Sequence, residues 1–580
     1  MAIPAVIKEA KDASFRVHRR IRVRPQEREV GEAIAQVTGV DPVVGRILAA
    51  RGFKPGKELD DFLSPTLKDG LPAPSELMNL DKACRAIADC HRAGKAIAIC
   101  CDFDVDGLSG GSVVHSFFNE AGVRSQVFVP DRFADGYGLN ERVVREIANA
   151  GFGLLLTIDF GTTNVKELAV AKELGLATVV VDHHHTGGKV PPADVFVNPH
   201  QDGCGFAKKI PCAAGLAWYL VVGLRKELGL TEIDPKSFLD LACLGTICDM
   251  VPLVGVNRVI AKRGLELLTQ TNRLGLKSMK NQIGIQRAVE CSDVSFGIGP
   301  RLNAAGRLVH GEVVVELLTT KDSNRADKLA KQLNDLNAER QEIEGTVKQE
   351  AIEMVERAGG PGPGIVVWHE EFHTGVIGIV AQRLVETYYR PSIVMGMDTE
   401  GIYKGSVRGI KNFSVVESLA AVGDLLIKFG GHEGAGGFSV KQENLMRFRE
   451  AFIDECGRRL EKIETVPYAD ADTEVLLSEI SIRMIDQLKG LAPFGTGNPA
   501  PTVLLRNMRV VEVRDIKGVH LKTLLSDGKR YISAVMWRQA SHPDLFVNNH
   551  VDVVFRPEVS TWGGSAELQA NIQAVQSSSS

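Results

Sequence analysis

The stretch AIAICCDFDVDG, residues 96–107, combines a short apolar run with three carboxylates at alternating positions. Its first half, Ala96–Cys101, has the length and apolar character of a fully buried strand. Its second half places Asp102, Asp104 and Asp106 directly after that strand. Alternate residues of an extended chain share one face, so we expect these three carboxylates to point to the same side.

Further apolar runs alternate with helical patterns downstream of this strand. Strands are predicted over Gln126–Val129, Leu154–Ile158 and Ala177–Val181. Helices between them are predicted over residues 108–121, 140–150 and 163–175. This alternation is typical of a doubly wound parallel sheet, an α/β fold. Ligands of such sheets bind outside the carboxyl ends of the strands, which is where the acidic residues lie.

A long polar helical pattern with apolar residues at helical spacing runs from Arg325 to Arg357, and a Gly/Pro-rich stretch ends it. We interpret it as a connector, although a long surface helix of the first domain fits the pattern equally well. A smaller α/β unit and five short strand-like runs follow; the runs predict a small β-barrel, for which an OB-fold is one candidate. The predicted parts are an N-terminal segment 1–75, a parallel-sheet domain 76–320, a connector helix 321–360, a second α/β domain 361–465 and a barrel 466–580.

The composition excludes several classes of protein. With 580 residues, 44% hydrophobic and 24% charged, the chain is an ordinary multidomain globular protein. A balance of 68 Lys and Arg against 72 Asp and Glu excludes a globally basic nucleic-acid binder, but not a local basic groove. The 10 Cys form no C-x-x-C pair, which fits a reducing compartment. No signal peptide or membrane-spanning run is recognisable, so we expect a cytoplasmic protein without membrane attachment.

Carboxylates and histidines follow three of the predicted strands. Besides the first triplet, Asp159 ends one strand, Asp182-His183-His184-His185 follows the next, and Asp249 ends a helical stretch. One Asp at a strand end is often only a helix N-cap, but repetition at three strand ends predicts a metal site. An EF-hand is a poor alternative, because Val113 stands where its loop needs Glu.

The types of ligand indicate which metal this site would prefer. Carboxylate oxygens with one or two imidazoles suit Mn²⁺ or Mg²⁺ better than Zn²⁺. The candidate ligands exceed what one ion needs beside substrate and water, so we expect two ions. Such a pair can clamp a phosphoryl group and lower the pKa of a bridging water. The predicted reaction class is therefore phosphoester hydrolysis.

Arginine and glycine-rich segments supply candidate partners for a phosphate. Arg fits phosphate bidentately, and backbone without side chains can approach it closely. The segments are GPRLNAAGR at 299–307, GSVR at 405–408 and an expected Gly-rich loop at 429–437. Residues 130–138 combine an Arg with a Tyr that could stack on a base, although an ordinary loop with a core Tyr is as good an interpretation. The stretch PFGTGNP at 493–499 is interpreted as a structured hinge before the barrel.

Together, and in this order, the motifs resemble the DHH phosphoesterase superfamily. The D-x-D-x-D-G stretch, the Asp-His-His and Asp249 match its first domain, and Gly-Gly-His at 430–432 looks like its second, DHHA1-type domain. From about residue 75 onward, the order of DHH domain, long helix, DHHA1 domain and OB-fold is similar to that of bacterial single-strand-specific DNA exonucleases within this superfamily.

The resemblance implies 5′→3′ degradation of single-stranded DNA to mononucleotides with Mn²⁺ or Mg²⁺, in DNA repair and recombination. Its implied metal ligands are Asp104, Asp106, Asp159, His183 and Asp249. Its implied catalytic residues are Asp102, His184, Arg301 and Arg307. Its implied substrate-binding residues are Arg132, Tyr137, Arg301, Asn303, Ser406, Arg408, Gly431 and His432. A single-strand-binding protein and a repair helicase are the implied partners of a monomeric enzyme.

Three positions depart from the family pattern. Cys101 stands where Gly is usual, Phe160 follows Asp159 where Asn is usual, and Val407 precedes Arg408 where Gly is usual. None of them removes a metal ligand, so they concern the surroundings of the ligands and the phosphate pocket.

Two other functions are alternatives to the exonuclease. A phosphodiesterase of cyclic dinucleotides or short oligoribonucleotides would use the same chemistry but would not need the barrel. A non-catalytic single-strand-binding scaffold would not need the complete set of ligands.

Overall fold

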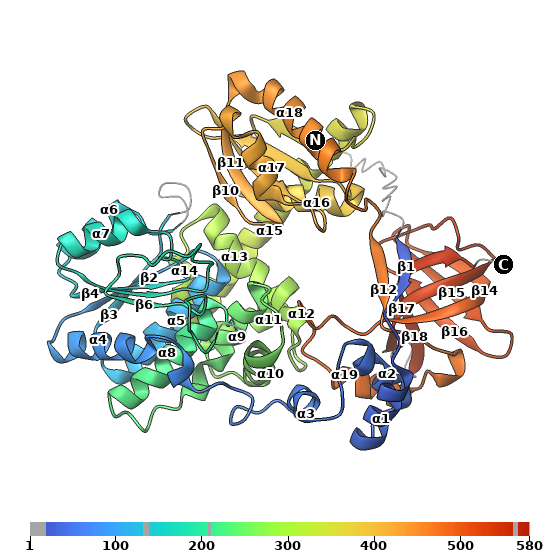
Figure 1. Cartoon of the computed structure of the whole chain (residues 1–580), viewed down its shortest axis with the longest axis horizontal. Helices are drawn as coiled ribbons and strands as arrows, with labels where there is room; N and C mark the ends of the chain where they lie inside the picture. Colours follow the sequence, from blue (N-terminus) through green and yellow to red (C-terminus); the bar gives the residue numbers. More distant parts are fainter. Residues whose placement is uncertain (1–18, 132–137, 207–209, 561–565, 579–580) are drawn as a thin grey trace, which may run out of the picture. The chain divides into compact units, whose positions relative to one another are not determined.

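The computed structural model describes residues 19–131, 138–206, 210–560 and 566–578 (Figure 1). The chain divides into two compact units. The parallel-sheet unit comprises Pro55–Arg340 and Lys489–Ala500, and the second unit comprises Met1–Lys54, Gln341–Leu488 and Pro501–Ser580. Where the individual domains begin and end stays a prediction from the sequence.

The parallel-sheet unit is built on five strands in the order β3-β2-β4-β5-β6, and every neighbouring pair is parallel. The strands are β2 (Ile97–Cys101), β3 (Ser125–Phe128), β4 (Leu154–Ile158), β5 (Ala177–Val181) and β6 (Val195–Val197). The first helices are α3 (Lys57–Leu63), α4 (Leu80–Arg92), α5 (Val105–Ala121), α6 (Glu141–Asn149) and α7 (Val165–Glu173). The predicted doubly wound α/β fold is confirmed, and all strand ends that carry acidic residues lie at one edge of the sheet.

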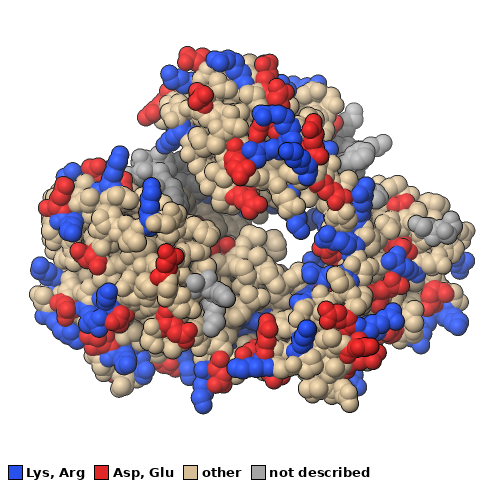
Figure 2. All heavy atoms as spheres, viewed as in Figure 1, with Lys and Arg blue, Asp and Glu red and all other residues tan. Residues whose placement is uncertain are grey.

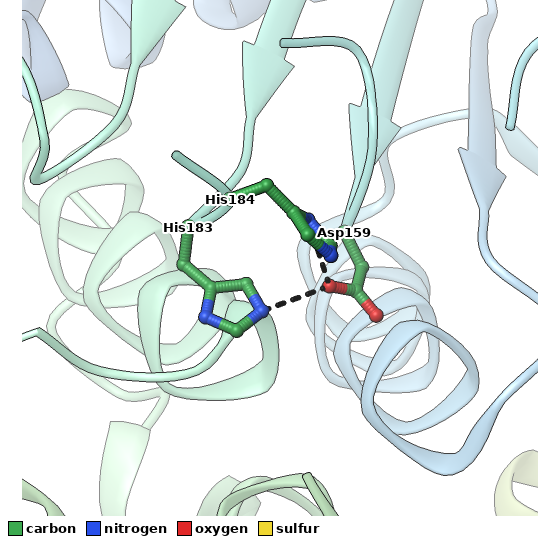
Figure 3. A group of neighbouring side chains, drawn as sticks. All are labelled: Asp159, His183 and His184. Atoms are coloured by element: carbon green, nitrogen blue, oxygen red, sulfur yellow. Dashed lines mark ion pairs between the residues drawn. The ribbon is translucent and has the colours of Figure 1, made fainter. Parts of the chain in front are cut away.

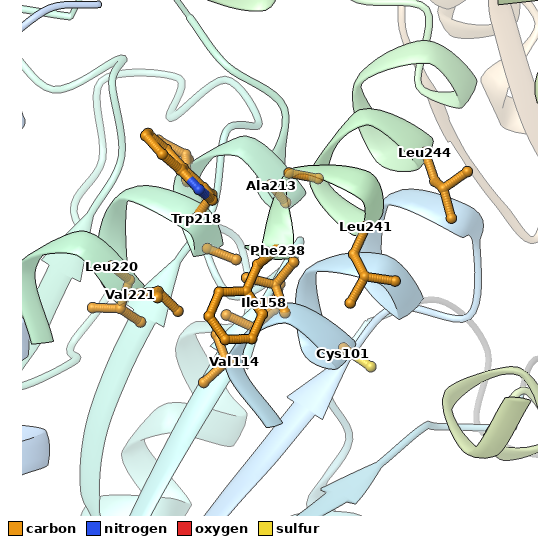
Figure 4. Close-up of a cluster of buried hydrophobic side chains, with 14 of the residues drawn as sticks. Cys101, Val114, Ile158, Ala213, Trp218, Leu220, Val221, Phe238, Leu241 and Leu244 are labelled. Atoms are coloured by element: carbon orange, nitrogen blue, oxygen red, sulfur yellow. The ribbon is translucent and has the colours of Figure 1, made fainter. Parts of the chain in front are cut away.

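Both faces of this sheet are covered, as a parallel sheet requires. Successive residues of a strand point to opposite faces. Ile97, Ile99 and Cys101 therefore pack in one apolar cluster with α4, α5, α8 (Ala213–Glu227) and α9 (Leu239–Cys248), part of which Figure 4 shows. Ala98 and Cys100 pack with α6 and α7 in a second cluster. The sheet is consequently a rigid frame whose polar groups are left at its carboxyl edge.

The start of α5 differs from the sequence-based prediction. The helix begins at Val105 rather than at residue 108, because Asp104 caps it: the Asp104 Oδ1 accepts the backbone N–H of Asp106 at 2.9 Å and of Gly107 at 3.1 Å. The expectation of three carboxylates on one extended chain is therefore wrong. Asp102 and Asp104 precede the helix, and Asp106 lies in its first turn.

The remaining helices of the parallel-sheet unit follow the sheet in sequence. They are α10 (Gly255–Thr269), α11 (Leu274–Gln282), α12 (Cys291–Asp293), the π-helical turn η3 (Val294–Ile298), α13 (Gly299–Leu308) and α14 (Glu312–Thr319). Helix α15 (Ser323–Arg357) then runs without interruption. Leu329 and Leu333 in its first half belong to the core of the parallel-sheet unit, and Val347 and Ala351 in its second half belong to a core of the second unit. These contacts make α15 a connector.

The second unit contains a five-stranded sheet in the order β10-β11-β9-β8-β7, in which only β7 and β8 are parallel. Its elements are β7 (Ile365–His369), α16 (Ile377–Tyr388), β8 (Ser392–Met397), β9 (Ile402–Arg408), α17 (Val415–Ala421), β10 (Lys428–Gly431), β11 (Ala435–Lys441) and α18 (Leu445–Leu460). The expected Gly-rich loop at 429–437 is wrong, because Gly430 pairs with Gly437 and Gly431 with Gly436 in a hairpin. The glycines serve backbone pairing there.

The C-terminal strands close into a barrel, because β14 pairs with β15 on one side and with β17 on the other. The strands are β12 (Tyr468–Ala471), β13 (Thr473–Glu474), β14 (Val503–Ile516), β15 (His520–Ser526), β16 (Tyr531–Met536), β17 (His550–Ser560) and β18 (Glu567–Ser577), with α19 (Ile482–Lys489) before β14. The predicted OB-fold is confirmed.

The N-terminal segment contributes a strand that the sequence did not reveal. β1 (Arg20–Val23) pairs in parallel with β12, and α1 (Arg28–Thr38) and α2 (Pro42–Ala50) follow it. Arg51 forms a buried ion pair with Asp472 at 2.8 Å. Both contacts join parts of the chain that are far apart in sequence, so no local pattern announces them.

The charges on the surface and the polarity of the helices agree with the amino-acid composition. On the face drawn in Figure 2, Lys and Arg are interspersed with Asp and Glu, as expected for a net charge of −4. None of the helices in the described ranges is long and apolar enough to cross a bilayer.

Candidate metal centre

At the carboxyl edge of the sheet, an acidic residue directly follows each of three neighbouring strands. Asp102 follows β2, Asp159 follows β4 and Asp182 follows β5, and all three are at most 3% exposed. Asp159 has a left-handed backbone with φ of 71°, which is uncommon for a residue other than Gly and concentrates at functional sites. The sheet thus gathers carboxylates that water cannot screen.

The structure brings the predicted ligands together in three overlapping groups. Within each group, one ligand atom per residue lies within 4.8 Å of the others. The groups are Asp102 with Asp104 and Asp159, Asp106 with His183 and Asp249, and Asp159 with His183 and His184. Because the groups share members, five carboxylates and two histidines form one connected cluster, which we call the acidic cluster.

His183 lies at the centre of the acidic cluster. Its Nε2 is 3.2 Å from the Asp159 Oδ1, 3.6 Å from the Asp106 Oδ2 and 3.7 Å from the Asp249 Oδ2. Figure 3 shows the rings of both histidines directed at the Asp159 carboxylate, with His184 Nδ1 at 3.9 Å. Donor atoms from three strand ends and from the end of α9 therefore converge on one small region.

The electrostatics of the acidic cluster call for a cation. Burial, and then the neighbouring carboxylates of Asp106 and Asp104, hold the pKa of Asp159 well above its ordinary value. The same causes raise the pKa of Asp249 to about 8. The buried Asp159 Oδ1 accepts no hydrogen bond from the residues described. Buried, mutually repelling carboxylates with an unsatisfied oxygen fit a hard divalent ion such as Mn²⁺ or Mg²⁺.

His184 is held by Asp182, which was expected in the strand-end motif but not among the ligands or catalytic residues. The Asp182 Oδ1 lies 2.7 Å from the His184 Nδ1 and also accepts the backbone N–H of His183 at 2.7 Å. Burial opposes the charge of both side chains, but their hydrogen bond and the attraction of their opposite charges together outweigh it: the pKa of His184 rises to about 9 and that of Asp182 falls. His184 is consequently an imidazolium at neutral pH in this arrangement.

Asp106 is fixed by the first turn of a neighbouring helix. Its two carboxylate oxygens accept the backbone N–H groups of Ala213 at 2.7 Å and Ala214 at 2.9 Å, at the N-terminus of α8. The positive end of the helix dipole favours a carboxylate there. These backbone donors carry no side-chain signal, and sequence reasoning missed them.

Helix α13 carries Arg301, Asn303 and Arg307 and packs against two segments of the acidic cluster. A Cβ on Gly306 would stand 2.6 Å from the backbone oxygen of Phe103, and one on Gly299 would stand 2.6 Å from the Sγ of Cys248. Only glycine allows approaches this close. The helix therefore lies beside the acidic loop after β2 and beside the end of α9 that precedes Asp249.

Arg301 is half-buried among neutral partners. Its Nε donates to the Asn334 Oδ1 at 2.9 Å and its Nη1 to the Gly297 backbone oxygen at 2.8 Å. Burial, and then the nearby Arg340, lowers its pKa. A guanidinium whose hydrogen-bond partners in the described chain are neutral is suited to an anion such as phosphate.

Other predicted substrate residues belong to the second unit and form their own group. Ser406 and Arg408 lie within β9, and the Arg408 Nη1 donates to the Ser406 Oγ at 2.9 Å. A Cβ on Gly378, in the first turn of α16, would stand 3.0 Å from both side chains. His432 follows Gly431 in the exposed turn after β10, where its Nδ1 accepts the backbone N–H of Gly434 at 3.2 Å. Arg132 and Tyr137 lie outside the described residues.

Three family models match consecutive parts of the chain. They are the DHH family N-terminal domain over residues 96–246, the DHHA1 domain over 362–458 and the RecJ OB domain over 471–574. The single-stranded-DNA-specific exonuclease RecJ of Bacillus subtilis is 35% identical over 556 residues, which cover 95% of this chain and 70% of that relative. This chain belongs to the RecJ family. The resemblance inferred from the motifs is confirmed.

Two solved structures of a RecJ protein are similar to this chain over nearly its full length. RecJ from Thermus thermophilus in complex with Mn²⁺ has a TM-score of 0.84 and 29% sequence identity, covering 97% of this chain and 80% of that one. The same protein in complex with Mg²⁺ has a TM-score of 0.78 and 27% identity, covering 97% and 79%. Both solved complexes hold an ion of the type that the donor set of the acidic cluster favours.

The three departures from the RecJ family pattern all fill apolar cores. Cys101 is fully buried beside α5, where a Cβ on Gly111 would stand 2.9 Å from its Sγ. Phe160 is 2% exposed in the cluster of α6 and α7, and Val407 is fully buried in the core of the second unit. They are therefore packing residues.

We expect the Asp249→Asn substitution to stabilise the metal-free protein, increasingly so at higher pH. The folded state keeps a proton on Asp249 up to about pH 8, whereas the unfolded chain releases it near pH 4. This raised pKa costs stability progressively as pH rises from 4 to 8. In urea unfolding with a chelator, the free energy of unfolding of Asp249→Asn should exceed that of the wild type hardly at all at pH 4.5. At pH 8.5 it should exceed it by on the order of 1 to 3 kcal/mol.

Asp89→Asn is the matched control, because the Asp89 side chain in the same unit is 72% exposed. It should show no such trend. Equal pH profiles for Asp249→Asn and Asp89→Asn would mean that Asp249 is not crowded by other carboxylates.

Proposed function

We propose that this chain is a divalent-metal-dependent exonuclease that degrades single-stranded DNA from its 5′ end to 5′-mononucleotides. The observation that carries the proposal is the buried acidic cluster at the carboxyl edge of the sheet in a member of the RecJ family. The reaction is hydrolysis of a phosphodiester bond. Its proposed role, from the family resemblance, is in DNA repair and recombination in the cytoplasm.

The metal would be held by Asp104, Asp106, Asp159, His183 and Asp249. Their number supports two ions of Mn²⁺ or Mg²⁺, because a single ion beside water and substrate needs fewer ligands. Ions bound there would supply an activated water and neutralise the charge of the phosphate. Asp102 adds a further buried negative charge beside Asp104 and Asp159 and so favours retention of cations.

The chain's own cations would act on the scissile phosphate. Asp182 orients the His184 ring and raises its pKa, and a protonated His184 would stabilise the negative charge that develops on the phosphoryl oxygens. Arg301 and Arg307 lie on α13, which packs at Gly306 against the loop after β2, and they are proposed to stabilise the same negative charge. Asn303 on the same helix is a neutral donor for the DNA backbone.

The 5′ phosphate is proposed to be recognised by the Ser406 and Arg408 group of the second unit. Ser406 and Arg408 combine a hydroxyl and a guanidinium with the first turn of α16, a combination that binds phosphate well. By the family resemblance, Arg132 is proposed to bind a phosphate, Tyr137 to stack on a base, and Gly431 with His432 to contact the strand. The barrel β14–β18 adds a sequence-tolerant platform for longer DNA.

The proposed partners and oligomeric state rest on the resemblance to the family. A single-strand-binding protein and a repair helicase are the proposed partners, and the enzyme is proposed to act as a monomer.

The test compares 5′-labelled and 3′-labelled single strands and duplexes in Mn²⁺, with and without a chelator. We expect a labelled mononucleotide to appear first from the 5′-labelled single strand, little cleavage of duplex, and no activity with chelator. Asp159→Asn should lose several kcal/mol of transition-state stabilisation, about a thousandfold in rate. Full activity of this variant, while Asp89→Asn behaves as wild type, would refute the site.

Gly306→Ala should lower kcat/KM by roughly tenfold to a hundredfold, since an added Cβ must push α13 off the loop after β2. Gly345→Ala is the matched control: it also changes a helical glycine, but its Cβ meets nothing within 4 Å. It should keep full activity and gain about 1 kcal/mol of stability. Equal activities of the two variants would show that α13 does not place groups at the reaction site.

Arg408→Ala should raise KM for 5′-phosphorylated strands by about tenfold to a hundredfold, because a charge-assisted hydrogen bond is lost. Strands with a 5′-hydroxyl should be affected little. Lys404→Ala is the control on the same strand, since Lys404 already pairs with Asp398 at 3.0 Å. A similar loss for both kinds of 5′ end would exclude Arg408 from phosphate recognition.

A further inference from the structure

The stretch Pro493–Pro499 is a closed, docked loop rather than a hinge. Asn498 is 3% exposed, and its Nδ2 donates to the backbone oxygens of Leu491 at 3.0 Å and Pro493 at 2.8 Å. Gly495 and Asn498 exchange two backbone hydrogen bonds of 2.9 and 3.1 Å. We call residues Leu491–Pro499 the clasp.

The clasp packs on the segment Pro252–Leu253. The backbone oxygen of Thr496 accepts the Leu253 N–H at 2.7 Å. A Cβ on Gly495 would stand 2.8 Å from the Leu253 Cδ1, and one on Gly497 would stand 2.9 Å from the Pro252 Cβ. Gly497 also has a left-handed φ of 74°. Glycine is thus required at 497, and a side chain at 495 would have to displace the tip of Leu253.

A buried arginine fixes the base of the clasp. Arg258 is 2% exposed, and its Nη2 donates to the backbone oxygen of Ala492 at 3.0 Å. Its Nε donates to the backbone oxygen of Phe62 at 2.9 Å, and its guanidinium lies 3.8 Å from the Phe62 ring centroid. Burying a guanidinium is costly unless it is hydrogen-bonded, so this anchor is specific.

The segment that the clasp grips carries a candidate metal ligand. Asp249 ends α9, and Met250 follows it with a left-handed φ of 62°. Pro252 follows after Val251, and its backbone oxygen accepts a hydrogen bond from the Asn257 Nδ2 at 3.1 Å. The backbone after Asp249 is therefore held at Pro252 and Leu253 by the clasp on one side and by α10 on the other.

We infer that the clasp is a positioning element for Asp249 and thereby sets the affinity of the acidic cluster for divalent ions. The inference rests on the proposed metal binding. Although the clasp belongs to the parallel-sheet unit, the residues on both sides of it belong to the second unit, and β14 of the barrel begins soon after Pro499. The chain that forms the barrel thus also secures a metal ligand.

The test is Mn²⁺ binding to the full chain without DNA, measured from the electron paramagnetic resonance signal of free Mn²⁺. Gly497→Ala should weaken binding about tenfold, the lower end of the loss typical when support of a ligand is removed. Gly229→Ala is the matched control, because Gly229 has a φ of 71° and its Cβ would meet nothing within 4 Å. It should bind Mn²⁺ as wild type does.

A double-mutant cycle with Asp249→Asn separates positioning from general damage. If the clasp acts through Asp249, Gly497→Ala should add little to the loss caused by Asp249→Asn. Equal effects of Gly497→Ala and Gly229→Ala, or an undiminished extra loss in the Asp249→Asn background, would overturn the inference. Asn498→Ala replaces Gly497→Ala in the cycle if the latter does not fold. A wild-type chain that binds no Mn²⁺ would instead refute the proposed function.

Discussion

The parallel sheet brings several buried carboxylates close together, and their mutual repulsion governs both the stability of this unit and its affinity for cations. Asp102, Asp106 and Asp159 are nearly inaccessible to water, and Asp249 joins the same cluster from the end of α9. Buried like charges raise one another's pKa and destabilise the metal-free fold, and a divalent cation reverses both effects. The carboxylates that would bind metal therefore lower the stability of the metal-free fold. Once a cation is bound, the same carboxylates contribute to the stability of the fold.

Close packing at glycines brings separate parts of the chain to this cluster. Gly306 lets α13 reach the loop after β2, and Gly497 lets the clasp reach Pro252. At each contact, backbone or apolar atoms fix the distance. The two histidines contact the carboxylates directly: the His184 Nδ1 is hydrogen-bonded to Asp182, and the His183 Nε2 lies within 3.7 Å of three carboxylates.

The predictable part of the site followed from topology. Parallel strands end at one edge, so residues after β2, β4 and β5 had to meet there, and the resemblance named the ligands among them. The start of α5 could not be read from alternation, because N-capping by Asp104 competes with an extended chain. The hairpin of β10 and β11 looked like a loop, since its glycines pair through backbone alone. The β1–β12 pairing and the docking of the clasp are long-range contacts that no local pattern encodes.

The most direct test is an anomalous difference map from crystals of the full chain soaked in Mn²⁺. The account predicts two peaks bounded by Asp104, Asp106, Asp159, His183 and Asp249. A map with no peak in the acidic cluster, recorded at an Mn²⁺ concentration that supports DNA degradation, would contradict it.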